Sequence, residues 1–136
     1  MLFQGTCSNQ FFNGDLINDS AGGYWSAWSD LNMIHLDQWN FSNAKGPSVA
    51  SAGASQHPHL VPLGASNMLL SWGSGTGIAA QVRAMADGST VGSQFTINVM
   101  DHAYIAFKAY ADGSAAYPAA GKDSMSVNVA RVMPCQ

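Results

Sequence analysis

Charged side chains are scarce in this chain of 136 residues, of which only 10% are Asp, Glu, Lys or Arg. A typical globular protein carries about 25% of these residues. The surface must therefore be covered largely by small residues such as Ser, Asn, Gly, Ala and Thr. Such a surface provides little electrostatic repulsion between copies and tends to associate, unless glycans or partners cover it.

Positive charge is scarcer still, with five Lys and Arg and a net charge of -3. Five dispersed cations cannot form a basic stripe, so we expect no nucleic acid as a partner. No apolar run approaches the roughly 20 residues of a membrane-spanning helix, so no membrane insertion is expected. A charged segment followed by an apolar one is also missing, so no signal peptide is predicted, as in a mature, trimmed chain.

Catalytic motifs are missing as well. There is no Gly-x-Ser-x-Gly nucleophile elbow. The glycine-rich segment 73–77 contains no Lys and is therefore not a phosphate-binding loop. Three histidines lack further ligands at metal-site spacing apart from Asp101, and we expect them to hydrogen-bond to turns: His57, His59 and His102. We predict no enzyme activity, no catalytic residues, no metal site and no cofactor.

The two cysteines, Cys7 and Cys135, lie almost at opposite ends of the chain. A disulfide between them would close a very long loop, worth up to roughly 5 kcal/mol in the chain-entropy model. The alternative is two unrelated thiols. The triplets that begin at Asn18 and Asn40 match the N-glycosylation signal Asn-x-Ser/Thr. Together, these features favour an extracellular, secreted protein that is glycosylated at both asparagines.

The stretch 57–97 contains four short apolar runs with a turn signal between each pair. It predicts one antiparallel sheet with strands at 60–63, 68–72, 78–84 and 95–99. The run 68–72 is almost wholly apolar, which predicts a strand covered on both faces. Good helix formers in 78–85 also allow a short helix, but eight residues between glycines are too few for a stable one.

The remaining segments also favour strands, so the predicted fold class is all-β. Residues 33–39 alternate, with one face made of Met33, His35, Asp37 and Trp39. Phe95, Ile97 and Val99 alternate in the same way and are predicted to point inward. In 125–133, Val127 and Val129 share a face, but Arg131 has the same parity, so the alternation is predicted to slip near the end.

Large residues recur at a period of about 45. Trp28, Trp72 and Tyr117 are 44 and 45 residues apart, and Ile34 and Ile78 are 44 apart. The spacing predicts one β-repeat domain over 1–136, built from four-stranded antiparallel units at about 9–53, 54–98 and 99–136. The third unit ends after its third strand. We expect an N-terminal strand to supply the fourth, stapled in place by the disulfide between Cys7 and Cys135.

The middle unit resembles a repeat of large bacterial surface and secreted proteins. The matching residues are Pro58, Leu60, Leu63-Gly64, Met68 to Trp72, Gly77 to Gln81, and Asp87 to Phe95 with its pattern Asp-Gly-x-x-Val-Gly-x-x-Phe. The resemblance implies a β-propeller blade. Propellers usually have four to eight blades, so either the chain is part of a larger propeller or copies of it combine. A β-trefoil or a β-prism is the alternative with threefold internal repetition.

Aromatic residues are dense in the first unit, where the repeat is least regular. Trp28 and Trp72 stand at repeat positions and are predicted to fill the core. Exposed aromatic rings stack on sugars, and the candidate ligand-binding residues are Tyr24, Trp25, Trp39, Asp37 and Asn40. The sequence thus predicts a non-catalytic extracellular β-repeat module that acts by self-association or by binding a partner such as another propeller fragment. The alternative is a glycan-binding lectin that uses the first-unit aromatics.

Overall fold

The computed structural model describes residues 14–19, 21–29, 33–40, 45–52, 57–74, 77–99, 107–120 and 126–134. These residues contain strands and turns but no helix, so none of them forms a helix that could cross a membrane. Sheet A consists of β1 (Gly14–Asn18), β2 (Tyr24–Ser29), β3 (Met33–Trp39) and β4 (Lys45–Ala52). Sheet B consists of β5 (His59–Leu63), β6 (Asn67–Gly73), β7 (Ile78–Ala84) and β8 (Thr90–Ile97). Sheet C consists of β9 (Lys108–Ala109), β10 (Ala115–Ala120) and β11 (Val127–Val132).

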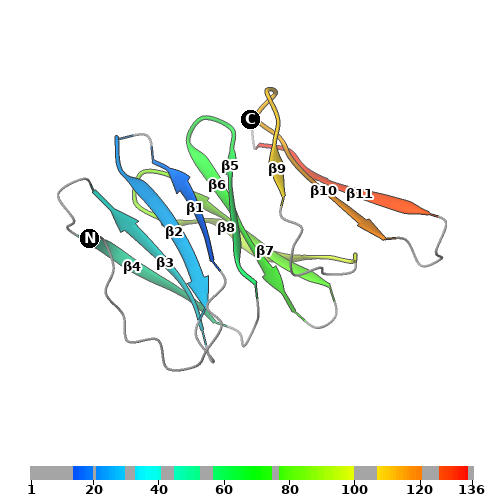
Figure 1. Cartoon of the computed structure of the whole chain (residues 1–136), viewed down its shortest axis with the longest axis horizontal. Coiled ribbons are helices and arrows are strands. Elements are labelled where there is room, and N and C mark those ends of the chain that lie inside the picture. The colour runs from blue at the N-terminus through cyan, green and yellow to red at the C-terminus, as the bar shows by residue number, and fades with distance from the viewer. Residues whose placement is uncertain are drawn as a thin grey trace.

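Each sheet is an antiparallel meander in which consecutive strands are neighbours, as predicted for the three units (Figure 1). The all-β prediction is confirmed, and four strands are present in 57–97 as predicted, although the fourth runs over Thr90–Ile97 rather than 95–99. The short helix considered for 78–85 is wrong, because Ile78–Ala84 pairs along its length with β6. Within the described residues, sheet C has three strands. The predicted closing strand near the N-terminus lies outside these residues.

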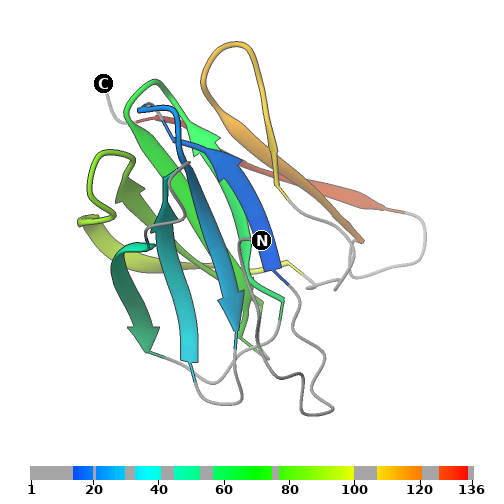
Figure 2. The same cartoon turned by 60° about the vertical axis from the view of Figure 1, so that its left-hand side comes forward.

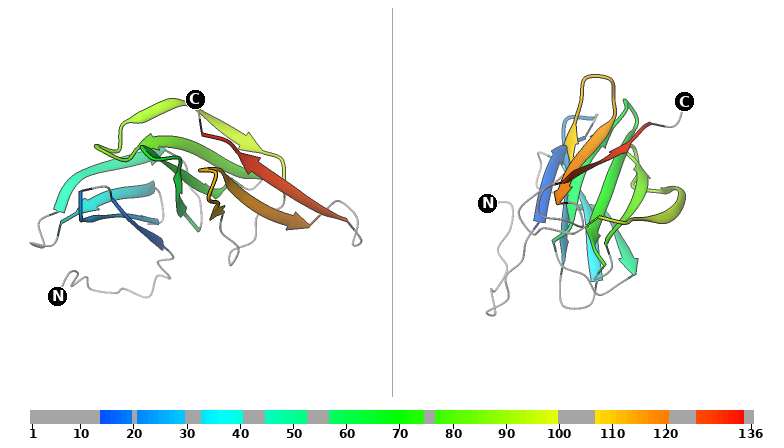
Figure 3. Two further views of the ribbon diagram at one scale, coloured as in Figure 1. Left: turned by 90° about the horizontal axis from the view of Figure 1, so that it is seen from above. Right: turned by 90° about the vertical axis from the view of Figure 1, so that its right-hand side faces the viewer.

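The three sheets follow one another along an open arc (Figure 3). The first strands β1, β5 and β9 lie on the concave side of the arc, and β4, β8 and β11 lie on the convex side. β1 contacts β5, and β5 contacts β9. Figure 2 shows the same order from another direction, with sheet A in front of sheet B. The sheets therefore stack face to face and splay apart toward their outer strands.

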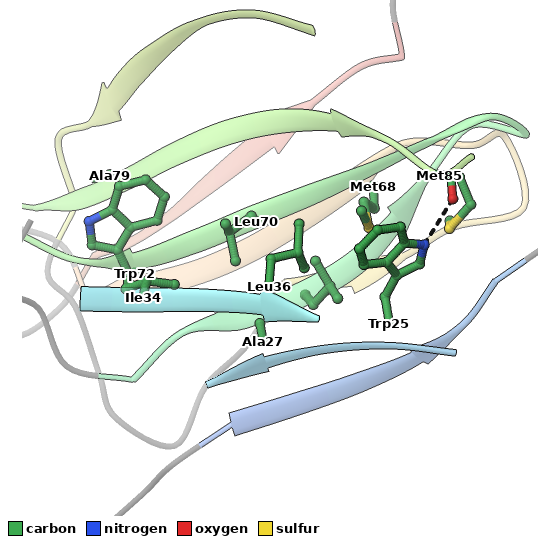
Figure 4. Close-up of a cluster of buried hydrophobic side chains, with 10 residues drawn as sticks. Trp25, Ala27, Ile34, Leu36, Met68, Leu70, Trp72, Ala79 and Met85 are labelled. Atoms are coloured by element: carbon green, nitrogen blue, oxygen red, sulfur yellow. Dashed lines mark hydrogen bonds between the residues drawn. The ribbon is translucent and has the colours of Figure 1, made fainter. Parts of the chain in front are cut away.

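The first hydrophobic core fills the space between sheets A and B (Figure 4). Strands β2 and β3 alternate, so every second side chain points toward sheet B. The cluster combines residues of both sheets: Trp25, Ala27, Ile34, Leu36, Leu60, Met68, Leu70, Trp72, Ala79 and Met85. The indole nitrogen Nε1 of Trp25 donates a hydrogen bond of 2.8 Å to the backbone carbonyl oxygen of Met85. This bond ties sheet A to the turn between β7 and β8.

A second core lies between sheets B and C. It contains Val61, Leu63, Leu69, Ile78, Ala80, Val82, Phe107, Ala115, Tyr117 and Ala119. Alternate residues of β6 contribute to the two cores, and six of its seven residues are buried. Sheet B is thus covered on both faces, as the apolar run 68–72 predicted. The prediction that Trp72 fills the core is also confirmed.

The three sheets share one pairing register. Trp28 pairs with His35 in sheet A, Trp72 pairs with Ala79 in sheet B, and Tyr117 pairs with Ala130 in sheet C. The large aromatics predicted to be repeat markers therefore occupy equivalent positions. We call the face that carries this aromatic residue the front face of each sheet, and the opposite face the back face. The back face of sheet A packs on the front face of sheet B, and the back face of sheet B packs on the front face of sheet C.

One expectation about side-chain direction was wrong. The alternation in β11 does not slip at Arg131, because Val127, Val129 and Arg131 all lie on the exposed back face of sheet C. Phe95 pairs with Ala80 and therefore points to the same face of sheet B as Ile97, as predicted, but it is exposed, whereas Ile97 and Val99 pack against the second core. The register between β7 and β8 shifts between Ala80 and Val82, close to the point where Phe95 pairs.

Aspartates shape three turns in the same way. Asp19, Asp87 and Asp112 each accept a hydrogen bond of 2.9–3.0 Å from the backbone N–H two residues later. This arrangement mimics a backbone turn and explains why these short connections are stable. Hydrogen bonds from the side chain and N–H of Ser89 hold the pKa of Asp87 below its ordinary value, and those of Ser114 do the same for Asp112.

Candidate functional site

The front face of sheet A gathers most of the candidate ligand-binding residues of the first unit. Tyr24 pairs with Trp39, Ser26 with Asp37, and Trp28 with His35, so all six share this face. The alternation predicted for 33–39 places its residues correctly. Tyr24, Trp28 and Trp39 are each half-buried. The face is an aromatic platform with polar side chains between the rings.

A buried carboxylate fixes one end of this platform. The side chain of Asp37 is almost fully buried, and its Oδ2 accepts a hydrogen bond of 2.8 Å from Nε1 of Trp28. The imidazole of His35 stacks on the indole of Trp28, with ring centroids 4.0 Å apart and an angle of 13° between the planes. Asp37 therefore fixes the orientation of the Trp28 indole through this hydrogen bond. Its burial keeps it from contacting a ligand that lies on the rings.

The other end of the platform is fixed by a serine and by a turn. Nε1 of Trp39 donates a hydrogen bond of 2.9 Å to Oγ of Ser26. In the turn between β1 and β2, Asp19 accepts hydrogen bonds from the N–H of Gly23 and from Nε2 of Gln38. A Cβ at Gly23 would collide with the carbonyl oxygen of Trp39, so only glycine lets the turn approach β3 this closely. Burial opposes the ionisation of Asp19, but these hydrogen bonds outweigh it and lower its pKa.

The remaining candidate residues occupy different positions. Trp25 lies on the back face of sheet A, fully buried in the first core, so its ring has no face to offer a sugar. We therefore assign Trp25 to the core. Asn40 follows β3 and is exposed. Trp28 and His35 were not among the candidates. Trp28 was predicted to fill the core because it stands at a repeat position, but it is half-buried, since its face in sheet A is not covered by another described sheet.

A second exposed surface lies at the opposite end of the stack, on the back face of sheet C. Val127 and Val129 of β11 are 72% and 68% exposed, and Met133 just after the strand is 56% exposed. Pro118 pairs with Val129 and is exposed beside it. Arg131 shares the face, donates a hydrogen bond of 3.0 Å from Nε to Oγ of Ser114, and forms an ion pair with Asp112.

An ionisable pair joins sheets A and B at their inner strands. Oδ2 of Asp15 lies 3.8 Å from Nδ1 of His59 and accepts a hydrogen bond of 3.2 Å from the N–H of Leu60. Burial opposes the ionisation of Asp15. The imidazole of His59 and the N–H groups of Leu16 and Leu60 outweigh it, so the pKa of Asp15 lies below its ordinary value. The pair links the two sheets rather than forming a cleft site.

The other sequence-predicted sites are only partly described. Asn18 and Asn40 are both exposed, while the serines that complete their glycosylation signals lie outside the described residues. Cys7 and Cys135 lie outside them as well, as does His102. In the described part of the chain, no three His, Cys, Asp or Glu residues lie close enough to hold a metal ion. Comparisons with protein-family models, with curated proteins and with solved structures find no match to this chain.

Proposed function

We propose that this chain is a non-catalytic extracellular β-repeat module that acts by association, with itself or with a partner, through the end faces of its sheet stack. The observation that carries the proposal is the cluster of large apolar side chains on the back face of sheet C, formed by Val127, Val129 and Met133. Clustered exposed apolar residues commonly mark interaction sites. Catalytic residues and a cofactor are not part of this proposal.

Surface composition supports association. Only 10% of the residues are charged, so the surface provides little repulsion between copies. The extracellular location is supported by the acceptor asparagines Asn18 and Asn40, both exposed, and by the two terminal cysteines, which suit an oxidising compartment. An arc of face-to-face sheets also suits a propeller-like ring that several such modules complete together.

Size-exclusion chromatography with light scattering tests the proposal directly. We expect a mass above that of the monomer at micromolar concentration. We also expect Val127→Asp to reduce it, because the charge would have to be desolvated in the interface. A wild-type protein that stays monomeric, and that captures no other repeat module of the same kind, would contradict the proposal.

A glycan-binding function is the second candidate, and the aromatic platform on the front face of sheet A favours it. Tyr24, Trp28 and Trp39 are half-buried on one face, and two of the indoles are held by hydrogen bonds. Rigid aromatic rings with one open face suit stacking on a sugar ring. We expect bound sugar to change the tryptophan fluorescence, and Trp39→Ala to weaken binding. Trp72→Phe is the control, because Trp72 lies in the core. No glycan-array signal and no fluorescence change would remove this candidate.

A further inference from the structure

The interface between sheets A and B and the interface between sheets B and C have the same arrangement. In each, the back face of one sheet packs on the front face of the next, and equivalent residues enter the core. On the front side, Trp72 and Tyr117 hold equivalent positions and are both buried. On the back side, Ile34 and Ile78 hold equivalent positions and are also both buried. The contact is therefore a repeated unit of packing, with one kind of surface on each side.

The two faces at the ends of the stack have the same residue positions, and on each an apolar residue is much more exposed than its equivalent inside the stack. On the front face of sheet A, Leu16 is 59% exposed, whereas its equivalent in sheet B, Leu60, is 3% exposed. On the back face of sheet C, Val129 pairs with Pro118 just as Ile34 pairs with Ser29. Val129 is 68% exposed, whereas Ile34 is 0% exposed. Each end therefore presents one side of a contact that the chain already makes twice.

We propose that the back face of sheet C in one copy docks on the front face of sheet A in a second copy. The proposal rests on the self-association proposed above and names the surfaces that carry it. It commits to a second copy because the two end faces continue the interface series inside the chain. Val127, Val129 and Met133 would cover Leu16 and Trp28 of the second copy, as the back face of sheet A covers Leu60 and Trp72.

A head-to-tail contact of this kind is heterologous, since two different surfaces meet. Heterologous contacts give closed rings when the rotation closes and open filaments when it does not. The sheets of each copy already follow an arc (Figure 3). Two copies with three described sheets each supply six sheets, which lies within the four to eight blades of known propellers. We therefore infer that the association stops at a closed pair.

Two variants test the assignment of the faces. Leu16→Asp places a charge on the front face of sheet A, and Val129→Asp places one on the back face of sheet C. Both wild-type side chains are exposed, so each variant is expected to keep the fold, which circular dichroism checks. We expect each variant alone to be monomeric in light scattering. Tyr110→Asp is the matched control, because Tyr110 is a large exposed residue in the turn after β9, and it should associate like the wild type.

Mixing the two variants gives the decisive result. Leu16→Asp retains an intact back face of sheet C, and Val129→Asp retains an intact front face of sheet A. A 1:1 mixture should therefore recover a dimer that neither variant forms alone. If only one variant dissociates, like faces meet, and the head-to-tail proposal is overturned while self-association stands. Failure of the mixture to recover a dimer overturns it as well. A monomeric wild type overturns self-association itself.

Discussion

The indole of Trp25 in sheet A donates its hydrogen bond to the backbone carbonyl oxygen of Met85 in the turn that ends β7 of sheet B. Both residues are buried, and they lie 60 residues apart in the sequence. This bond joins the first two repeat units through a polar contact inside an otherwise apolar core (Figure 4). It also explains why one of the most prominent aromatics of the first unit is unavailable to a ligand.

Replacing Trp25 by Phe should destabilise the protein by about 1–3 kcal/mol, because the buried carbonyl oxygen of Met85 loses its donor. Chemical denaturation followed by circular dichroism measures the loss. Trp39→Phe is the matched control, since that indole also donates a hydrogen bond, but to the half-buried Ser26. An equal loss in both variants would contradict a special role for the contact between sheets A and B.

Gly113→Ala should lower stability more than Gly92→Ala. Both glycines have positive φ angles, of 81° and 80°, so both substitutions should carry the cost of a left-handed backbone, about 1–2 kcal/mol. A Cβ at Gly113 would also lie 3.1 Å from Cα of Gly64, whereas one at Gly92 meets nothing within 4 Å. The carbonyl of Gly113 accepts the N–H of Gly64 at 2.7 Å. The unfolding midpoints of the two variants should be measured under the same conditions. The backbone cost is common to both, so the difference between the midpoints reports the crowding between sheets B and C.

Acid should weaken the contact between sheets A and B through Asp15. Its pKa is lower in the folded protein than in the unfolded chain, so its ionised form favours folding. That contribution is complete above the unfolded pKa of about 3.9 and is lost as the pH falls through the folded pKa. In Asp15→Asn, stability measured by denaturation should fall less steeply below pH of about 4 than in the wild type. If the stability of both proteins fell equally steeply with pH, Asp15 would not contribute to the acid sensitivity of this contact.

The sequence predicted the strands of sheet B well because local signals agree there. The run 68–72 is apolar, its flanks are turn formers, and Asp87 begins a turn that its own carboxylate stabilises. The first strand was harder to place. It begins at Gly14, and the turn that follows it lies at Asp19. Its five residues carry only two large apolar side chains, and its pairing with β2 defines it as a strand.

The candidate site could be predicted only in part, because exposure depends on where a sheet stands in the stack. Trp28 and Trp72 have equivalent registers, yet Trp72 is covered by sheet A and Trp28 is half-buried. Trp25 and Trp28 lie on the same strand but point to opposite faces of sheet A. The sequence alone does not show which of the two faces is covered. The position of Arg131 could have predicted the exposed face of sheet C. Its shared parity with Val129 indicates an exposed apolar face rather than a slip of the strand.

Coverage of sheet B on both faces implies an order of opening. Within the described parts of the chain, sheets A and C each pack against one neighbouring sheet, so either can separate while sheet B keeps a partner, as in stacked repeat arrays. In native-state hydrogen exchange, the amides of β6 should exchange only through global unfolding, and those of β4 and β11 through smaller openings. The end faces proposed to bind a second copy are then also the first parts to open. Association should slow exchange in sheets A and C much more than in β6.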